Sequence, residues 1–120
     1  MGMFNSILAN LRCPANREVG RDVEIQMKWQ ARDALSLSVY RLGDVLEEIE
    51  PEYDNNWVRT DYICHLCSPH TTGRNGSRYI KTDDQRRHFV YVRIDHGRIC
   101  EILTEEAFAK TGVADFVRYW

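Results

Sequence analysis

Short runs of alternating hydrophobic and polar residues dominate the chain, and this alternation predicts strands that are buried on one face. In "VEIQMKW" (residues 23–29) every second residue is apolar. "LSLSVY" (residues 35–40) alternates in the same way, and the "RLGD" that follows predicts a turn around Gly43. "NWVRTDYIC" (residues 56–64) predicts a further strand, which leads into a cysteine.

The clearest pattern lies in the C-terminal third of the chain. In "HFVYVRIDHGRICEIL" (residues 88–103), two β-rich runs flank "DHG", where Gly97 can adopt positive φ, so the pattern predicts a β-hairpin. Thr104 can cap a helix that begins with "EEAFAK", and Gly112 is its predicted stop. "VADFVRYW" (residues 113–120) spaces its apolar residues as one face of a further helical turn or two.

Three segments give weaker signals. "FNSILANL" (residues 4–11) has helical spacing but is too short to decide between helix and strand. The acidic "VLEEIEPEYDNN" (residues 45–56) fits a helical turn or a loop. "SPHTTGRNGSR" (residues 68–78) is rich in turn-forming residues and predicts a surface loop.

Composition indicates an ordinary globular protein. The 120 residues are 43% hydrophobic and 28% charged, which argues against wholesale disorder. The net charge of -2 gives no global cationic signature for nucleic acid or membrane, and no apolar run approaches the ~20 residues of a membrane helix. The start "MGMFNSILANLRCP" lacks the features of a signal peptide, so we expect a cytoplasmic protein whose cysteines are free thiols or metal ligands.

The segment "ICHLCSPH" (residues 63–70) carries the most specific chemistry. Cys64 and Cys67 form a Cys-x-x-Cys pair, whose spacing lets both thiolates face one ion from a tight turn, as in zinc ribbons and rubredoxin-like sites. One pair supplies only half of a tetrahedral site. Cys13 in "RCPAN" is a third candidate, and His70, three residues after Cys67, is the fourth.

Other interpretations of these cysteines stay open. Asn16 stands where a Cys-Pro-x-Cys knuckle would have its second thiolate, and a neutral amide is a poor zinc ligand, so a metal-free fold is an alternative. A redox-active Cys64/Cys67 pair is a third option, although the pair does not open a helix. Cys100, in the second strand of the predicted hairpin, is expected to be a small core residue.

Taken together, these elements predict an α+β fold. We expect a small antiparallel β-sheet domain with a zinc-ribbon-like knuckle and a C-terminal helix. Residues 1–120 should form a single domain, with the ribbon-like part at 1–70 and the loop, hairpin and helix at 71–120.

The N-terminal half also resembles a known group. "MGMFNSI", "CPAN", "QMKW", "YRLGD" and "YICHLC" together are similar to a group of small, largely uncharacterised bacterial and archaeal zinc-ribbon-like proteins. The resemblance covers roughly residues 1–67. It implies that Cys13, Cys64 and Cys67 correspond to ligand positions and that Asn16 replaces the fourth cysteine.

A basic segment offers a second kind of site. Residues 68–93 contain six basic and two acidic side chains, with aromatic residues between them. Arginines grip phosphates and aromatic rings stack on bases, so anion or nucleic-acid contacts are conceivable. The simpler interpretation is a solvated charged loop. The candidate contacts are Arg74, Arg78, Lys81, Arg86 and Arg87.

Catalytic chemistry has little support in the sequence. No nucleophile-elbow, zinc-protease, phosphate-loop or dinucleotide-binding pattern is present. His88 and His96 flank the predicted hairpin and could meet Cys100 or an aspartate in space.

The sequence therefore favours a small cytoplasmic accessory or interaction protein that binds another protein and is stapled by a structural zinc. A nucleic-acid-binding module and a small enzyme of unknown reaction are the alternatives.

Overall fold

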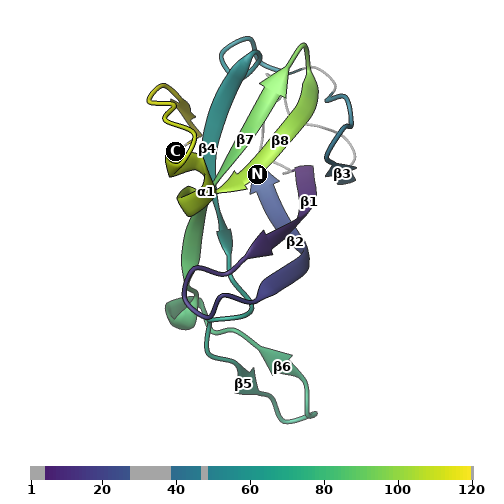
Figure 1. The fold of residues 1–120 in the computed structure, drawn as a ribbon. Coiled ribbons are helices and arrows are strands. Elements are labelled where there is room, and N and C mark those ends of the chain that lie inside the picture. The colour runs from purple at the N-terminus through teal and green to yellow at the C-terminus, as the bar shows by residue number, and fades with distance from the viewer. Residues whose placement is uncertain (1–4, 28–38, 47–48, 120) are drawn as a thin grey trace.

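The computed structural model describes residues 5–27, 39–46 and 49–119. About half of these residues are in strands, and the other regular elements are one 3₁₀ turn, η1 (Thr82–Asp84), and one short helix, α1 (Glu105–Ala109) (Figure 1). Its strands are β1 (Asn5–Arg12), β2 (Val19–Met27), β3 (Val39–Arg41), β4 (Asn56–Ile63), β5 (Thr71–Thr72), β6 (Arg78–Tyr79), β7 (Arg87–Asp95), β8 (Arg98–Thr104) and β9 (Val117–Arg118).

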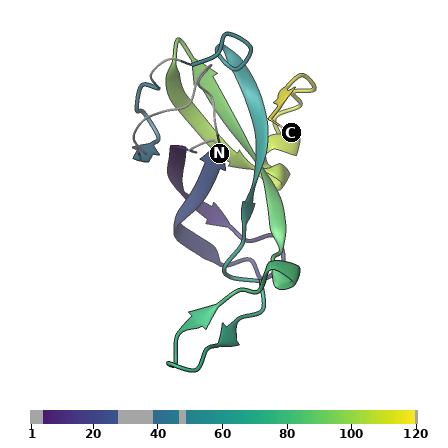
Figure 2. The ribbon, with the colours of Figure 1, turned by 180° about the vertical axis from the view of Figure 1, so that it is seen from behind.

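The strands form three sheets. One has the order β2-β1-β3, the second the order β8-β7-β4-β9, and the third is the small β5-β6 hairpin. Pairing is antiparallel except where β3 lies parallel to β1 and β9 parallel to β4. The β5-β6 hairpin extends away from the two larger sheets, which is visible from both sides (Figures 1 and 2).

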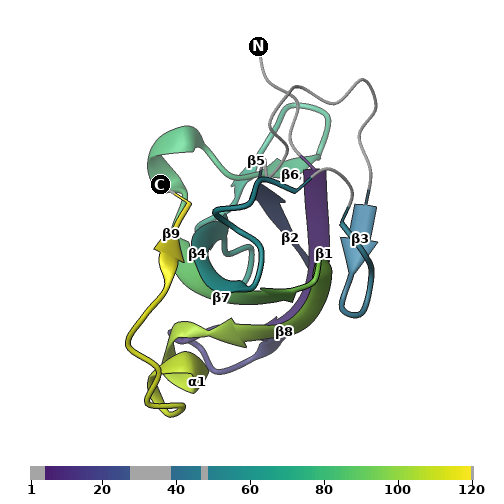
Figure 3. The same cartoon turned by 90° about the horizontal axis from the view of Figure 1, so that it is seen from above.

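The two larger sheets enclose one core. Viewed from above, β4, β2, β1, β8 and β7 surround a common interior, with β1 beside β8 and β2 beside β4 (Figure 3). Ile7 and Ile25 of the first sheet meet Val58, Val92 and Ile99 of the second sheet there, and all five are fully buried. This shared core holds in place the ends of β1 and β4, which are followed by Cys13 and by Cys64 and Cys67.

The N-terminal segment, which the sequence left open between helix and strand, is a strand. Within β1 the buried positions recur at every second residue, at Asn5, Ile7 and Leu11, with Ala9 partly buried between them. This period of two continues past the end of β1 to Cys13, which is also buried. The pattern therefore turns Cys13 inward.

The predicted hairpin at residues 88–103 is confirmed. β7 and β8 pair antiparallel around the turn at His96 and Gly97. Both turn residues have positive φ, at 50° and 76°, which is the backbone of a type I′ turn. The turn is held from outside because the backbone N–H of His96 donates to Asn55 Oδ1 at 2.8 Å.

The prediction of an α+β fold with a C-terminal helix is wrong. Strands hold about half of the described residues, and α1 has only five residues. Among the described residues, no helix is long and apolar enough to span a membrane. Thr104 does cap α1, accepting a hydrogen bond from the N–H of Ala107 at 3.3 Å. Gly112, with a φ of 76°, lies in the turn that follows, and the chain then enters β9 instead of a second helix. Phe116, one of the apolar residues in the segment predicted to be helical, packs edge-on against Tyr91.

The other strand predictions are confirmed as far as the structure describes them. The prediction for residues 23–29 corresponds to β2 up to Met27, and the one for 56–64 corresponds to β4. Most of the strand predicted at 35–40 lies outside the described residues. The turn after it is present, since Asp44 N donates to Arg41 O at 3.0 Å.

A buried hydroxyl in the core gives a stability prediction. Thr60 is 1% exposed, and its Oγ1 has no hydrogen-bond partner among the described residues. Because an unpaired buried hydroxyl costs roughly 1–3 kcal/mol, Thr60→Val should raise the free energy of unfolding by about 1 kcal/mol in urea titrations. The matched change Thr72→Val, at an exposed position of β5, should leave it within about 0.5 kcal/mol. A loss of stability in Thr60→Val would show that the hydroxyl is satisfied.

Candidate metal centre

Four side chains with metal-binding atoms converge at one end of the core. The sulfurs of Cys13, Cys64 and Cys67 and one ring nitrogen of His88 all lie within 4.8 Å of one another. His88 Nε2 is 3.2 Å from Cys67 Sγ and 3.9 Å from Cys13 Sγ. These four residues could hold a metal ion.

Cys13 enters the cluster from the first sheet, at the start of a tight loop after β1. The backbone N–H of Cys13 donates to Glu18 O at 2.7 Å, and Arg17 N donates to Cys13 O at 2.8 Å. Arg17 has a φ of 66°, a left-handed conformation that lets the chain reverse within a few residues. The reversal feeds the chain into β2 and leaves the Cys13 thiol facing inward.

Cys64 and Cys67 come from the second sheet, in the turn that follows β4. Ser68 N donates to Cys64 O at 3.2 Å, which closes the turn. The turn is also tied to the segment before β7, because Cys64 N donates to Arg86 O at 2.8 Å and Ser68 Oγ accepts from Arg86 N at 2.9 Å. Both thiols are therefore positioned by β4 and by the approach to β7.

His88 is the member of the cluster that the sequence-based ligand set did not contain. It lies near the start of β7, directly opposite Tyr62 of β4 in the antiparallel register. Inward-facing positions alternate along β7, so His88 shares the inner face with the buried Val90 and Val92. Cys64 follows Tyr62 by two residues, and the register thus brings His88 beside the cysteine turn.

The titration of the thiols reflects how closely they are packed. Burial raises the pKa of Cys67 to about 12, and the neighbouring thiols of Cys64 and Cys13 act in the same direction. Burial also raises the pKa of Cys13. The backbone hydrogen bonds from Asn16 and Ala15 and the hydrogen bonds with Cys64 and Cys67 together outweigh burial and lower the pKa overall. A divalent cation would offset the cost of ionising three adjacent sulfurs.

The two rings beside the thiols are held neutral. Burial lowers the pKa of His88, with the charge of Glu105 as a smaller opposing influence. Burial, followed by the charges of the nearby thiols, raises the pKa of Tyr62 to about 12. Neutral imidazole is the form that binds metal, so the pocket favours the ligand state of His88.

Asn16 does not belong to the cluster and has a different role. Its Nδ2 donates to Leu66 O at 3.2 Å, and its Oδ1 accepts from Glu18 N at 3.0 Å. The side chain therefore bridges the loop after β1 to the Cys64–Cys67 turn. It joins through hydrogen bonds two loops that a fourth thiolate would join through the metal.

His70, the fourth ligand in the sequence-based set, lies outside the cluster. Its side chain is exposed and packs near another exposed ring, His65, with ring centroids 6.2 Å apart. The chain has by then left the Cys64–Cys67 turn and entered the β5-β6 hairpin. The predicted and observed ligand sets differ because the chain leads His70 away from the Cys64–Cys67 turn, whereas pairing of β7 with β4 places His88 beside it.

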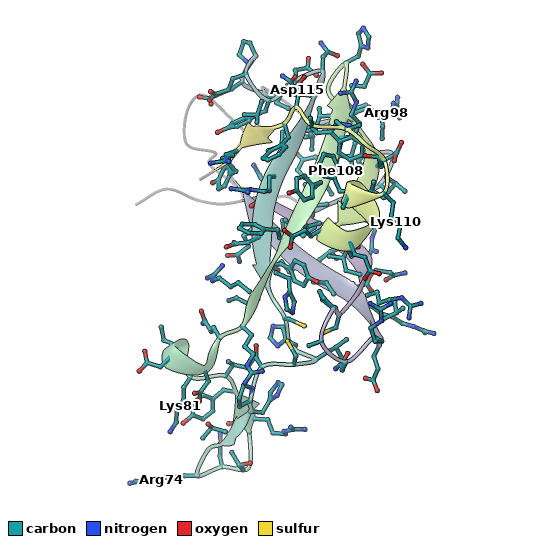
Figure 4. All side chains as sticks on the ribbon, turned by 60° about the vertical axis from the view of Figure 1, so that its left-hand side comes forward. Arg74, Lys81, Arg98, Phe108, Lys110 and Asp115 are labelled. Carbon is teal, nitrogen blue, oxygen red and sulfur yellow. The ribbon has the colours of Figure 1, made fainter. Side chains whose placement is uncertain are left out.

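The basic candidates are spread along the lower part of the molecule. Arg74 lies at the far end of the β5-β6 hairpin, and Lys81 lies beside η1 (Figure 4). Arg78 is in β6, and the backbone of Arg86 anchors the cysteine turn. Arg87, in β7, forms an ion pair with Asp61 at 3.1 Å.

The remaining catalytic candidates do not assemble. His96 lies in the β7-β8 turn with its Nδ1 2.9 Å from Asp95 Oδ1, and its ring is exposed. Cys100 is exposed, so its prediction as a core residue is wrong. In the β7-β8 register, Arg93 pairs with Glu101 and Ile94 with Ile99, so Cys100 is the extra residue of a β-bulge and points outward.

Comparisons with protein-family models, with curated proteins and with solved structures give no match for this chain. The resemblance of residues 1–67 to zinc-ribbon-like proteins stays a prediction. The case for the metal centre rests on its own geometry.

Proposed function

We propose that this chain is a small binding module whose β-rich fold is held together by one structural zinc ion at Cys13, Cys64, Cys67 and His88. The observation that carries the proposal is the convergence of their four ligand atoms within 4.8 Å of one another. The ligands come from the ends of three strands that are far apart in sequence. A shared metal ion gives a reason why three of the four cysteines and a neutral histidine lie together in a small core.

The donor set favours zinc. Three thiolates and one imidazole are a donor set that structural zinc sites use in tetrahedral coordination. Because four protein ligands fill that geometry, no position stays open for a substrate or an activated water. The proposed role of the metal is therefore structural and not catalytic.

The position of the site explains what the metal would stabilise. Cys13 extends β1 of the first sheet, whereas Cys64, Cys67 and His88 extend or belong to β4 and β7 of the second. One ion bound to all four would connect the two sheets at the end where the loop after β1 meets the turn after β4. Such a lock suits a module that presents a surface to another macromolecule, and that binding role is part of our proposal.

Metal analysis tests the proposal directly. Protein purified without added metal or chelator is expected to contain about one zinc per chain, as a complete four-ligand site requires. The Cys100→Ser variant, altered outside the cluster, should contain the same amount. Iron in place of zinc would reject the identity of the metal and keep the site. Metal-free protein that is fully folded would reject the structural role.

A further inference from the structure

The outer face of the four-stranded sheet is only partly covered. Along β4 and β7, alternate side chains point away from the core, among them Arg59 and Phe89. Phe108 of α1 covers one part of this face, stacked on Tyr91 with centroids 3.8 Å apart and 6° between the rings (Figure 4). Phe116 closes that aromatic cluster edge-on. Phe89 lies beyond it and is 39% exposed.

Arg59 is held on this face by two aromatic rings. Its guanidinium carbon lies 4.3 Å from the ring centroid of Phe89 and 5.3 Å from that of Phe116. The neighbouring strand adds a second cation, since Arg118 of β9 pairs with Arg59 in register and lies 5.8 Å from the same Phe116 ring. Both guanidiniums lie within cation–π distance of a ring, and this attraction favours their positions on the face.

These two cations, Arg59 and Arg118, have no ion-pair partner within the part of the chain that the structure describes. Asp61, which also lies on the outer face of β4, is engaged by Arg87. Two adjacent guanidiniums that no described carboxylate pairs with fit an anionic ligand, and their planar donor sets match phosphate oxygens.

The aromatic side chains decide which anionic ligand fits best. Bases of single-stranded nucleic acid stack on exposed rings and on guanidinium planes. The Arg59 guanidinium lies over one face of the Phe89 ring, and the ring is still partly exposed, so the pair offers both kinds of surface. An acidic peptide would use the arginines but would leave the ring of Phe89 without a matching group. In the β5-β6 hairpin, β6 adds the exposed Arg78 and Tyr79, and Tyr79 is 47% exposed.

We infer that the outer face of β4, β7 and β9 binds single-stranded nucleic acid. Arg59 and Arg118 contact backbone phosphates, and a base stacks on Phe89. The inference rests on the proposed role of the chain as a binding module and names its ligand, but it does not depend on the identity of the metal.

Fluorescence anisotropy with labelled oligouridylate and oligodeoxythymidylate tests this inference. Binding should weaken with added salt, with a slope of log affinity against log salt of about -1.4, as two neutralised phosphates of a single strand would give. Phe89→Ala should weaken binding roughly tenfold, within the range that loss of one stacked base produces. Arg59→Gln and Arg118→Gln should each weaken binding and make the salt slope shallower.

Matched controls separate this site from general attraction. Arg21→Gln removes the same charge from an exposed position of β2, on the other sheet, and should leave the affinity unchanged. A duplex of the same length should bind more weakly, because its bases cannot stack on Phe89. Arg118 is exposed, so Arg118→Gln tests the face even where Phe89→Ala disturbs folding.

Several outcomes would overturn the inference. One is that neither oligonucleotide binds at micromolar protein. Another is that Arg21→Gln and Arg59→Gln lose the same oligonucleotide affinity. A third is that an oligoglutamate peptide binds more tightly than the oligonucleotides, which would favour a protein partner. Zinc measured on the same samples keeps the two proposals apart. Zinc-loaded protein that binds no oligonucleotide would reject only the nucleic-acid inference. Oligonucleotide binding by folded, zinc-free protein would reject only the structural zinc.

Discussion

Replacing Cys64 with serine is expected to abolish zinc binding and to unfold the chain. The side chain is 3% exposed and belongs to the four-residue cluster, so no solvent or alternative ligand can take its place easily. Structural zinc contributes about 10–16 kcal/mol of apparent binding free energy in small zinc-folded peptides, which matches or exceeds the roughly 5–15 kcal/mol stability of a typical domain. Zinc content and the near-ultraviolet circular dichroism of Cys64→Ser would show the loss.

Cys100→Ser is the matched control for this experiment. It exchanges the same atom at an exposed position, where the thiol makes one weak contact with Arg98 O at 3.5 Å. The zinc content should stay unchanged, and the free energy of unfolding should change by no more than about 0.5 kcal/mol. Equal stability of the Cys64 and Cys100 variants would mean that the cluster holds no structural metal.

Replacing His88 with alanine is expected to weaken zinc binding a thousandfold or more, equivalent to about 4 kcal/mol. Loss of an outer-shell partner already costs about 10–100-fold in metal affinity, and His88 is proposed as a direct ligand. Its Nε2 lies 3.2 Å from Cys67 Sγ, so the ring is placed to share an ion with that thiolate. Competition of the variant and the parent protein with a chromophoric chelator measures the difference.

His70→Ala provides the comparison that discriminates between the two ligand sets. His70 is exposed and outside the cluster, so this variant should bind zinc like the parent protein. The opposite result, in which His70→Ala loses zinc and His88→Ala keeps it, would restore the ligand set based on sequence and reject the one based on structure.

Much of the β-structure could be predicted because strands leave a local signal. The period of two in β2 and β4 is visible within each segment, and the "DHG" turn marks the junction of β7 and β8. The same periodicity was present in β1, where Ile7, Leu11 and Cys13 all face inward. Leu8 next to Ile7 made a helical spacing equally consistent, and only pairing with β2 decides between the two.

The helical turns predicted at residues 113–120 were wrong, because the apolar residues there pack in another way. Phe116 packs on Tyr91 and Phe108, and Val117 of β9 pairs in register with Val58 of β4. The partners of these residues lie in α1, β4 and β7, and no local pattern in residues 113–120 reveals them. A helix of five residues also has little stability of its own, so tertiary contacts override the weak helical preference.

The metal centre was partly within reach of sequence analysis. Cys64 and Cys67 have a recognisable spacing, but the fourth donor depends on how strands pair. If residues 56–64 and 88–95 are both strands and adjacent antiparallel neighbours, His88 falls opposite the end of β4, next to Cys64. His88 alternates with Val90 and Val92, which marks an inward position. Those two signals together could have favoured His88 over His70.

Cys100 shows a limit of alternation itself. Its neighbour Ile99 is fully buried and Ile102 packs against the core, although the two are three residues apart. A regular strand cannot turn both inward, so one extra residue must be accommodated. The bulge accommodates it at Cys100 and turns the thiol outward. Only the spacing of Ile99 and Ile102 hints at this in the sequence.

The spread of the cluster along the chain has a consequence for the order of folding. Its members run from Cys13 to His88, so the intervening chain must close into long loops before the last ligand arrives. Closing long loops costs entropy before any contact repays it, and folds dominated by distant contacts form slowly. The Cys64–Cys67 turn alone can capture an ion early, because it needs only a local turn. Completion of the proposed site by Cys13 and His88 would then coincide with assembly of the two sheets, so an ion captured early would reach full coordination only in chains whose strands have paired correctly.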